Sequence, residues 1–258
     1  MSPFDSEAYQ RLRTAHALGT TVHYREVTGS TMDDARTAAD AVGIAGCGHV
    51  FVAGEQVTGR GRQGRHWVSP PGVGLYATFH LCPSSVEHAP LLTIVGALAV
   101  ADAVSATAGL ATQFKWPNDV QVRGRKLAGV VAESRLGARI DVFLGVGVNV
   151  RAVRPPDEIA AIATSIEREG APPPRLELLL ASLCGSLERW MERVEAAPDE
   201  VIAQWRLKLV TLGRHVRLAT PGGEVEGDAV DVTPLGELVL RHADGRTAPY
   251  AAGDVTAV

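Results

Sequence analysis

The sequence predicts an α+β fold: a mixed β-sheet domain with helices packed on it, followed by a small C-terminal β-barrel. Residues 20–150 mix short β-rich runs with two helical patterns, and residues 157–209 are helical in pattern. From Gly213 onward apolar and polar residues alternate between turns, which is typical of a small all-β unit. The expected domains are residues 1–211 and 212–258.

The first elements are predicted from pattern and capping. Residues 22–27 form a strand, and Ser30 begins a helix that continues to Ala41, because hydroxyls followed by carboxylates suit a helix N-terminus. Residues 49–53 and 75–81 are apolar and strand-like. The Gly-, Arg- and Pro-rich segment between them is expected to be a long irregular loop.

The next elements are a buried helix and a set of hairpins. Residues 91–107 are apolar on nearly all sides, which indicates a core helix. Strands are expected at 112–116, at 119–131 with a turn at Arg123-Gly124, and at 140–150. Residues 157–209 should form two or three helices broken at 172–174, and the C-terminal turns should lie at 221–223, 234–236 and 244–245.

Composition is that of an ordinary globular protein. The 258 residues, 46% of them hydrophobic, are enough for one large and one small domain, and a net charge of -4 argues against a general nucleic-acid binder. Cys47, Cys82 and Cys184 are widely spaced and form no C-x-x-C pair, so we expect reduced thiols and no structural zinc site.

No targeting or membrane segment is expected. The N-terminus lacks a basic region followed by an apolar core, and the longest apolar stretch, residues 91–101, is shorter than the roughly 20 residues that span a bilayer. The sequence therefore predicts a cytoplasmic protein that does not enter a membrane.

The loop from Gly59 to Arg65 matches G-x-G-x-x-G, the pattern of a dinucleotide-binding turn. That reading requires a helix to begin at the loop, but Pro70 and Pro71 follow soon after, and no Gly-Lys-Ser/Thr of a P-loop is present. The glycines permit close approach to a ligand, and the arginines match phosphate and carboxylate oxygens. The loop is therefore either an anion clamp or a solvated basic strip.

A second group of polar residues surrounds a predicted hairpin. Lys115-Trp116-Pro117-Asn118-Asp119 ends one strand and starts the next, and Arg125-Lys126-Leu127-Ala128-Gly129 returns after a two-residue turn. The hairpin can bring Lys126 near Asp119 and Asn118. Gly129, Gly145 and Gly147 interrupt strong strands, which indicates either bulges or close approach of a ligand.

Taken in this order, the Gly-Arg-Gly-Arg-x-Gly-Arg loop, Lys-Trp-Pro-Asn-Asp, Arg-Lys-Leu-Ala-Gly and Gly145-Val146-Gly147-Val148-Asn149 resemble the biotin protein ligase family over residues 20–150. The resemblance implies a class II synthetase-like catalytic domain and an SH3-like C-terminal barrel. The family's Ser-Thr-Asn motif appears as Ser30-Thr31-Met32, and methionine cannot replace the hydrogen bonds of asparagine.

The resemblance implies these site residues. Lys126, Arg62 and Asp119 are the catalytic candidates. Biotin contacts are expected from Ser30, Thr31, Gln56, Gly59, Arg60, Gly61, Arg62, Lys126, Gly129 and Gly147. ATP contacts are expected from Arg62, Arg65, Trp67, Lys115, Asn118, Lys126 and Asn149. Without the resemblance, Ser30 and Thr31 would be read as a helix cap and Trp67 as a core aromatic.

The implied activity is a two-step ligation: Mg-ATP and biotin form an acyl-adenylate, which a lysine of a biotin carboxyl carrier domain attacks. Asp119 is a possible Mg²⁺ ligand, and no tightly bound prosthetic group is expected. The protein is expected to be a monomer or weak homodimer that binds no DNA.

Three alternatives remain open at this point. A lipoate or octanoate ligase should lack the arginine loop, which this chain has. A transcriptional regulator would need a helix-turn-helix domain of about 60 residues, whereas about 20 precede the first predicted strand. A protein that retains biotinyl-adenylate without transferring it is favoured only by Met32.

Overall fold

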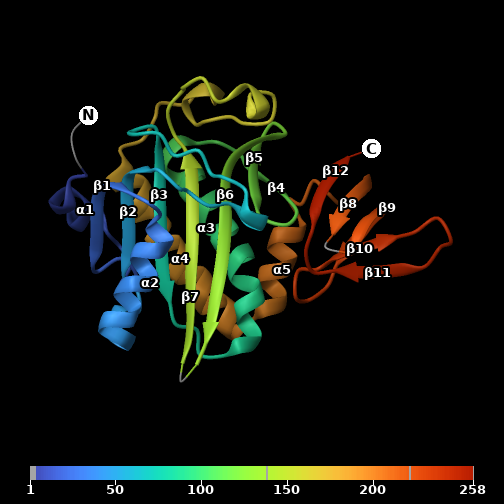
Figure 1. Ribbon diagram of the computed structural model, residues 1–258, viewed down its shortest axis with the longest axis horizontal. Coiled ribbons are helices and arrows are strands. Elements are labelled where there is room, and N and C mark those ends of the chain that lie inside the picture. Colours follow the sequence, from blue (N-terminus) through green and yellow to red (C-terminus); the bar gives the residue numbers. More distant parts are fainter. Residues whose placement is uncertain (1–3, 138, 221, 258) are drawn as a thin grey trace.

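A seven-stranded mixed sheet forms the larger part of the molecule (Figure 1). The computed structural model describes residues 4–137, 139–220 and 222–257. The strand order is β1-β2-β3-β7-β6-β5-β4; β1 and β2 pair in parallel and the other neighbours pair antiparallel. The strands are β1 (Val22–Thr28), β2 (Val50–Gln56), β3 (Gly74–Leu81), β4 (Gln113–Lys115), β5 (Asp119–Val122), β6 (Arg125–Leu136) and β7 (Ile140–Asn149). The predicted fold class is confirmed.

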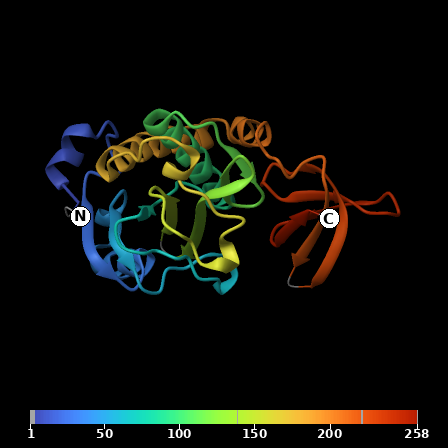
Figure 2. The same ribbon diagram turned by 90° about the horizontal axis from the view of Figure 1, so that it is seen from above.

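Helices cover both faces of this sheet (Figure 2). Alternate residues of a strand point to opposite faces, and β2 shows the result: Phe51 packs in a small cluster with Met32 and Ala39 of α2 (Thr31–Val42), whereas Val50 and Val52 join the main core. That core also contains α3 (Leu92–Ala108) and α4 (Leu176–Ala196). The shorter helices are α1 (Ser6–Leu12) and α5 (Pro198–Arg206).

The α3 helix is the apolar core helix that the sequence predicts, but its apolar stretch is longer than expected. Together with the 3₁₀ turn η3 (Val86–Leu91) it forms a helical stretch of 23 residues, and an 18-residue window of this stretch has a mean hydropathy of 1.8, which is long and apolar enough to cross a membrane. About 67% of this apolar window is buried inside the protein, as expected for a core helix.

Residues 157–171 contain no α-helix, so the prediction of helix from 157 onward was wrong. They form two 3₁₀ turns, η4 (Asp157–Ile159) and η5 (Glu167–Glu169), and α-helix begins only at Leu176, after the predicted proline break. The physical reason is a competing partner. Lys126 N–H donates to the Ile162 carbonyl at 2.7 Å and Thr164 N–H donates to the Lys126 carbonyl at 2.8 Å, so this segment pairs with β6.

The C-terminal part is a five-stranded antiparallel sheet of order β11-β10-β9-β8-β12. Its strands are β8 (His215–Thr220), β9 (Gly223–Val232), β10 (Leu238–Arg241), β11 (Thr247–Tyr250) and β12 (Asp254–Ala257). The predicted turns at 234–236 and 244–245 are present, with Gly236 and Gly245 at positive φ. Residue 221 of the first predicted turn lies outside the described residues. Trp116 Nε1–H donates to the Gly236 carbonyl at 3.0 Å and joins the two parts.

Cys47 and Cys82 form a disulfide, so the expectation of three reduced thiols was wrong; Cys184 is free and buried. The β2–β3 register explains the pairing. Val50 lies opposite Phe79, and continuing that antiparallel register for three residues places residue 47 opposite residue 82. Spacing along the chain could not reveal this, because the contact depends on which strands pair.

Candidate functional site

A cavity of about 230 Å³ lies between the N-terminus of α2, the middle strands of the sheet and the arginine loop, which is defined as residues 59–67. Most of the predicted site residues line it: Ser30, Thr31, Gln56, Arg60, Gly61, Arg62, Arg65, Trp67, Asn118, Lys126, Gly129, Gly147 and Asn149. Gly59, Lys115 and Asp119 are not among the lining residues.

The cavity wall includes a capped helix start. The Ser30 side chain accepts a hydrogen bond from Met32 N–H at 3.3 Å, which is the N-cap that the sequence predicts. Both Ser30 and Thr31 are buried and line the cavity. The positive end of the α2 dipole therefore points toward any ligand held there.

A hydrogen-bond network fixes Gln56. Its Oε1 accepts from Thr31 N–H at 2.9 Å and from the Thr31 hydroxyl at 3.0 Å, while its Nε2–H donates to Ser69 Oγ at 3.0 Å. The Thr31 hydroxyl also lies 2.8 Å from Thr78 Oγ1. These polar side chains hold one another in place through their hydrogen bonds.

Trp67 lies across the glycines of β6 and β7. A Cβ on Gly147 would overlap the Trp67 indole, and one on Gly129 would come within 3.1 Å of the same ring. The strand glycines therefore make room for an aromatic side chain, which explains their occurrence in otherwise strong strands. Trp67 Nε1 is buried and has no hydrogen-bond partner among the described residues, so a ligand acceptor could satisfy it.

Lys126 is held between an acid and an aromatic ring. Its Nζ lies 2.6 Å from Asp119 Oδ1 and 5.3 Å from the centre of the Trp67 ring. The Lys126 side chain is 28% exposed, so the ammonium group is reachable from the cavity. The predicted approach of Lys126 to Asp119 is confirmed, and Asp119 contacts Lys126 without itself lining the cavity.

The remaining polar candidates are tied to the sheet. Asn118 Nδ2–H donates to the Val130 carbonyl at 2.9 Å, and Asn149 Nδ2–H donates to the Thr164 carbonyl at 2.9 Å. Lys115 lies opposite Asp119 in the β4–β5 register. The Gly59 carbonyl accepts from Trp67 N–H at 2.9 Å, so Gly59 shapes the loop without lining the cavity.

The arginine loop is not followed by a helix, as predicted, and it folds back on itself. Gly61 N–H donates to the Arg65 carbonyl at 2.7 Å. Arg60 pairs with Asp33 in the first turn of α2. Near the other end of the loop, Arg65 Nη2 lies 2.6 Å from Asp254 Oδ1 on β12.

Arg62 joins the arginine loop to the C-terminal sheet and lines the cavity. Its Nη1–H donates to the Gly253 carbonyl at 3.3 Å. Burial lowers the pKa of the Arg62 guanidinium from its ordinary value. A partly desolvated cation at the cavity mouth attracts an anion more strongly than an exposed one would.

Several lining residues were not predicted from the sequence. Two of them are Thr78, a strand residue, and Met32, which the sequence marks only as the replacement for asparagine in the Ser-Thr-Asn motif. Ile159, Ile162 and Ala163 lie in the segment that was predicted to be helical. The alternation of β3 could have indicated Thr78, but no local pattern marks residues 159–163, because pairing with β6 brings them to the cavity.

The cavity combines an apolar interior with cations at its mouth. Trp67, Val131 and Ile162 provide apolar walls, while Arg62 and Lys126 provide positive charge. This arrangement suits a small molecule with an apolar body and an anionic end, and it suits a reaction that develops negative charge near Lys126.

Comparisons with known proteins agree on one family. The sequence pattern of the biotin/lipoate A/B protein ligase family matches residues 25–149, and that of the biotin protein ligase C-terminal domain matches residues 211–256. The biotin--[acetyl-CoA-carboxylase] ligase of Mycobacterium tuberculosis is 36% identical over 88% of this chain and 85% of its own. The bifunctional ligase/repressor BirA of Bacillus subtilis is 30% identical over 96% of this chain and 77% of its own.

A solved structure shares the fold. The biotin protein ligase of Aquifex aeolicus in complex with biotin and ATP has a TM-score of 0.79 at 26% identity, covering 92% of this chain and 98% of its own. The match spans both the seven-stranded sheet and most of the C-terminal unit, since so little of either chain is left out.

Proposed function

This chain belongs to the biotin protein ligase family and has its ligase activity, and from this premise we propose a two-step reaction with assigned residue roles. Biotin is activated by Mg-ATP to biotinyl-5′-AMP, and the biotinyl group is then transferred to a lysine of a biotin carboxyl carrier domain. The observation that carries the role assignment is Lys126, held by Asp119 at the mouth of a cavity with apolar walls.

In the first step the biotin carboxylate oxygen attacks the α-phosphorus of ATP and pyrophosphate leaves. Two anions must approach one another, and charge accumulates on the phosphoryl oxygens, so fixed cations lower the barrier. Lys126 stabilises this charge, with Arg62 beside it. Asp119 positions Lys126 through the 2.6 Å ion pair.

Biotin is proposed to lie deepest in the cavity. Ser30, Thr31 and Gln56 offer polar groups there, and Trp67 covers the apolar part of the molecule. Gly129 and Gly147 contribute by leaving space for the Trp67 ring, while Arg60 and Gly61 close from the arginine loop.

ATP is proposed to lie nearer the mouth. Arg65 contacts its phosphates, and Asn118 and Asn149 fix the shape of the neighbouring walls through their backbone hydrogen bonds. Lys115 does not line the cavity, so we assign it no direct contact with ATP. It lies opposite Asp119 in the β4–β5 pair and supports that residue.

Magnesium is proposed to arrive with ATP. Mg²⁺ prefers one or two carboxylates together with substrate phosphates and water, and the Asp119 carboxylate, which lies against Lys126 of the cavity wall, fits that donor set. The ion would neutralise phosphate charge. The protein's own contribution is to hold Asp119 and Lys126 in place.

In the second step the amine of a carrier lysine attacks the anhydride carbonyl carbon, AMP leaves, and the attacking nitrogen loses a proton. AMP is a good leaving group, so alignment of the amine provides much of the rate. The carrier domain belongs to a biotin-dependent carboxylase, and we place the reaction in the cytoplasm. The boundary between the catalytic and C-terminal domains is placed at residues 211/212.

The test is to incubate the protein with labelled biotin, Mg-ATP and a biotin carrier domain. Label on the carrier lysine, which is lost when that lysine is replaced and absent with labelled lipoate, supports the proposal. Labelled adenylate that never reaches the carrier contradicts it, and so does equal transfer of lipoate.

A further inference from the structure

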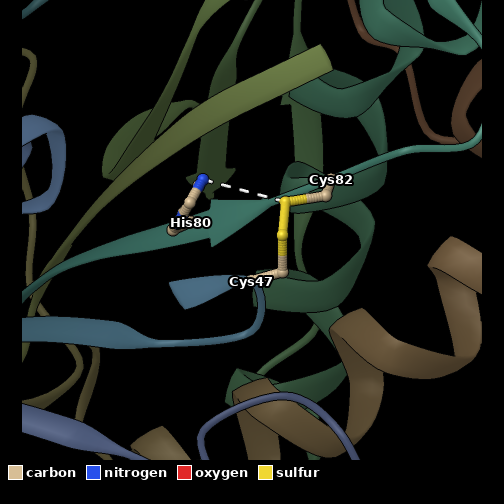
Figure 3. Close-up of side chains that lie close together, drawn as sticks. All are labelled: Cys47, His80 and Cys82. Carbon is tan, nitrogen blue, oxygen red and sulfur yellow. Dashed lines mark hydrogen bonds between the residues drawn. A yellow bond between two sulfur atoms is a disulfide. The ribbon is translucent and has the colours of Figure 1, made fainter. Parts of the chain in front are cut away.

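A second cluster of ligating side chains lies where β2 begins and β3 ends, away from the arginine loop. Cys47, His80 and Cys82 place one ligand atom each within 4.8 Å of one another (Figure 3). Cys82 is four residues along the chain from Thr78 of the cavity wall, roughly 13 Å in a strand. The cluster is therefore separate from the ligase site.

The backbone suits two uses of the cysteine pair. The Cα atoms of Cys47 and Cys82 are 5.8 Å apart, so the sulfurs can bond to each other, as they do here. The same span allows two thiolates to share one tetrahedral zinc ion, which would hold them about 3.7 Å apart from Zn–S bonds of about 2.3 Å. Both side chains are half-buried.

His80 is oriented as a metal ligand. Its Nδ1–H donates to the Gly46 carbonyl at 2.9 Å, and since that carbonyl can only accept, Nε2 is the nitrogen left for another partner. Nε2 lies 3.7 Å from Cys82 Sγ and 2.8 Å from Asp141 Oδ1. A cation at Nε2 would thus meet a thiolate and a carboxylate oxygen at once.

We propose that Cys47, Cys82 and His80 form a binding site for a thiophilic divalent cation such as zinc, which becomes available only when the Cys47–Cys82 disulfide is reduced. Soft thiolates together with an imidazole are the donors that select zinc. The disulfide and the metal are mutually exclusive, because each uses the same two sulfur atoms.

A dithiol can reduce the Cys47–Cys82 disulfide. Two electrons and two protons pass from the dithiol to the Cys47–Cys82 bond, which gives two protein thiols and leaves the dithiol oxidised. Zinc then displaces the two thiol protons, which pass to the solvent, and binds at Nε2 beside the Asp141 carboxylate. Arg135 and Arg139, at 3.0 and 2.5 Å from the Asp141 carboxylate, hold it in position throughout.

The test uses the full chain and cobalt(II) as a coloured substitute for zinc. The protein is reduced with a phosphine, which is then removed without air, and is titrated with Co²⁺ beside an oxidised sample. We expect the reduced form to bind one equivalent, with a thiolate-to-cobalt charge-transfer band that zinc abolishes, and the oxidised form to show no such band. Thiol titration in denaturant should count three thiols in the reduced sample and one in the oxidised sample.

Matched variants locate the site. Cys82→Ser and Cys47→Ser should weaken binding at least about 100-fold, whereas Cys184→Ser and His49→Asn should bind as the parent does. His80 is buried, so the serine variants, which are nearly isosteric, carry the test if His80→Asn fails to fold. Absence of the band in the reduced parent, or its persistence in the Cys47→Ser/Cys82→Ser double variant, overturns the proposal. Biotin adenylation by that double variant should be unchanged, which separates this test from that of the ligase site.

Discussion

Lys126 Nζ lies 2.6 Å from Asp119 Oδ1 because a bulge in the β5–β6 ladder turns the lysine toward the acid. Asp119 pairs with Gly129, and Val120 pairs with Ala128, but Gln121 pairs with Lys126. Leu127 of β6 is therefore the extra residue, with no partner on β5. Residues three apart, such as Lys126 and Gly129, would point to opposite faces of a regular strand. The bulge brings them to the same face, beside Asp119.

Replacing Lys126 should abolish most adenylate formation without unfolding the protein. We expect Lys126→Ala to slow pyrophosphate release about 100-fold, since one lost charge stabiliser costs roughly 3 kcal/mol in the transition state. Lys208→Ala, at an exposed position, is the matched control and should keep full activity. Near-parental pyrophosphate release by Lys126→Ala would refute its assigned role.

A side chain at residue 147 should block biotin binding. Gly147→Val places atoms where the Trp67 indole lies, and the displaced ring should fill the cavity. We expect the biotin dissociation constant, measured by calorimetry, to rise at least about fivefold, because such overpacking costs about 1–3 kcal/mol. In Gly137→Ala the new Cβ lies 4.0 Å from the Arg139 carbonyl oxygen, so this variant should bind biotin normally. Equal affinity in the two variants would contradict the proposed position of Trp67.

The contact between Arg65 and Asp254 should help keep the arginine loop over the bound adenylate. Both side chains are partly exposed, so the ion pair is worth no more than about 1 kcal/mol. Asp254→Ala should therefore shorten the lifetime of bound biotinyl-adenylate by up to about fivefold, measured by chase with unlabelled ligand. Asp244→Ala, in the turn between β10 and β11 and paired with Arg246, should leave that lifetime unchanged; a similar loss in both variants would rule out a specific effect.

Glu169 should position the segment that lines the cavity. Its buried carboxylate accepts from Arg125 at 2.7 Å, Arg123 at 3.3 Å and the Thr164 hydroxyl at 2.6 Å. Glu169→Ala leaves these donors unpaired, so we expect a loss of about 2–3 kcal/mol in the free energy of unfolding in urea. Because Ile162 of the same segment forms an apolar wall of the cavity, KM for biotin should rise as well. If stability and KM are both unchanged, the contacts of Glu169 neither stabilise the fold nor position the segment.

Glu188 should make the fold sensitive to acid. Burial alone would raise the pKa of Glu188, but backbone N–H donors of Ala17, His16 and Leu18 outweigh it and hold the pKa below its ordinary 4.5. A lowered pKa contributes stability above pH 4.5 that is lost as the pH falls through the folded-state pKa. Glu188→Gln should therefore be less stable than the parent at pH 7, and the difference should shrink below pH 4.5 in thermal unfolding. A difference that stays constant with pH would exclude this origin.

The sequence alone determined the elements whose signals are local. Alternation and capping placed the strands of residues 22–150 and the Ser30 cap, and the continuous apolar pattern placed α3. The arginine loop with Pro70 and Pro71 after it excluded a nucleotide-binding helix start, as the structure confirms. Most candidate site residues could be chosen by motif, since glycines and charged groups at fixed spacing reflect what the ligand requires.

Only the tertiary structure decided the features that depend on strand pairing. The β5–β6 bulge determines which face Lys126 lies on, the β2–β3 register joins Cys47 to Cys82, and pairing with Lys126 keeps residues 159–163 from forming an α-helix. Each of these depends on a partner distant in sequence. The local sequence pattern reflects the secondary structure that a residue prefers, whereas the strand register determines which distant residues its side chain contacts.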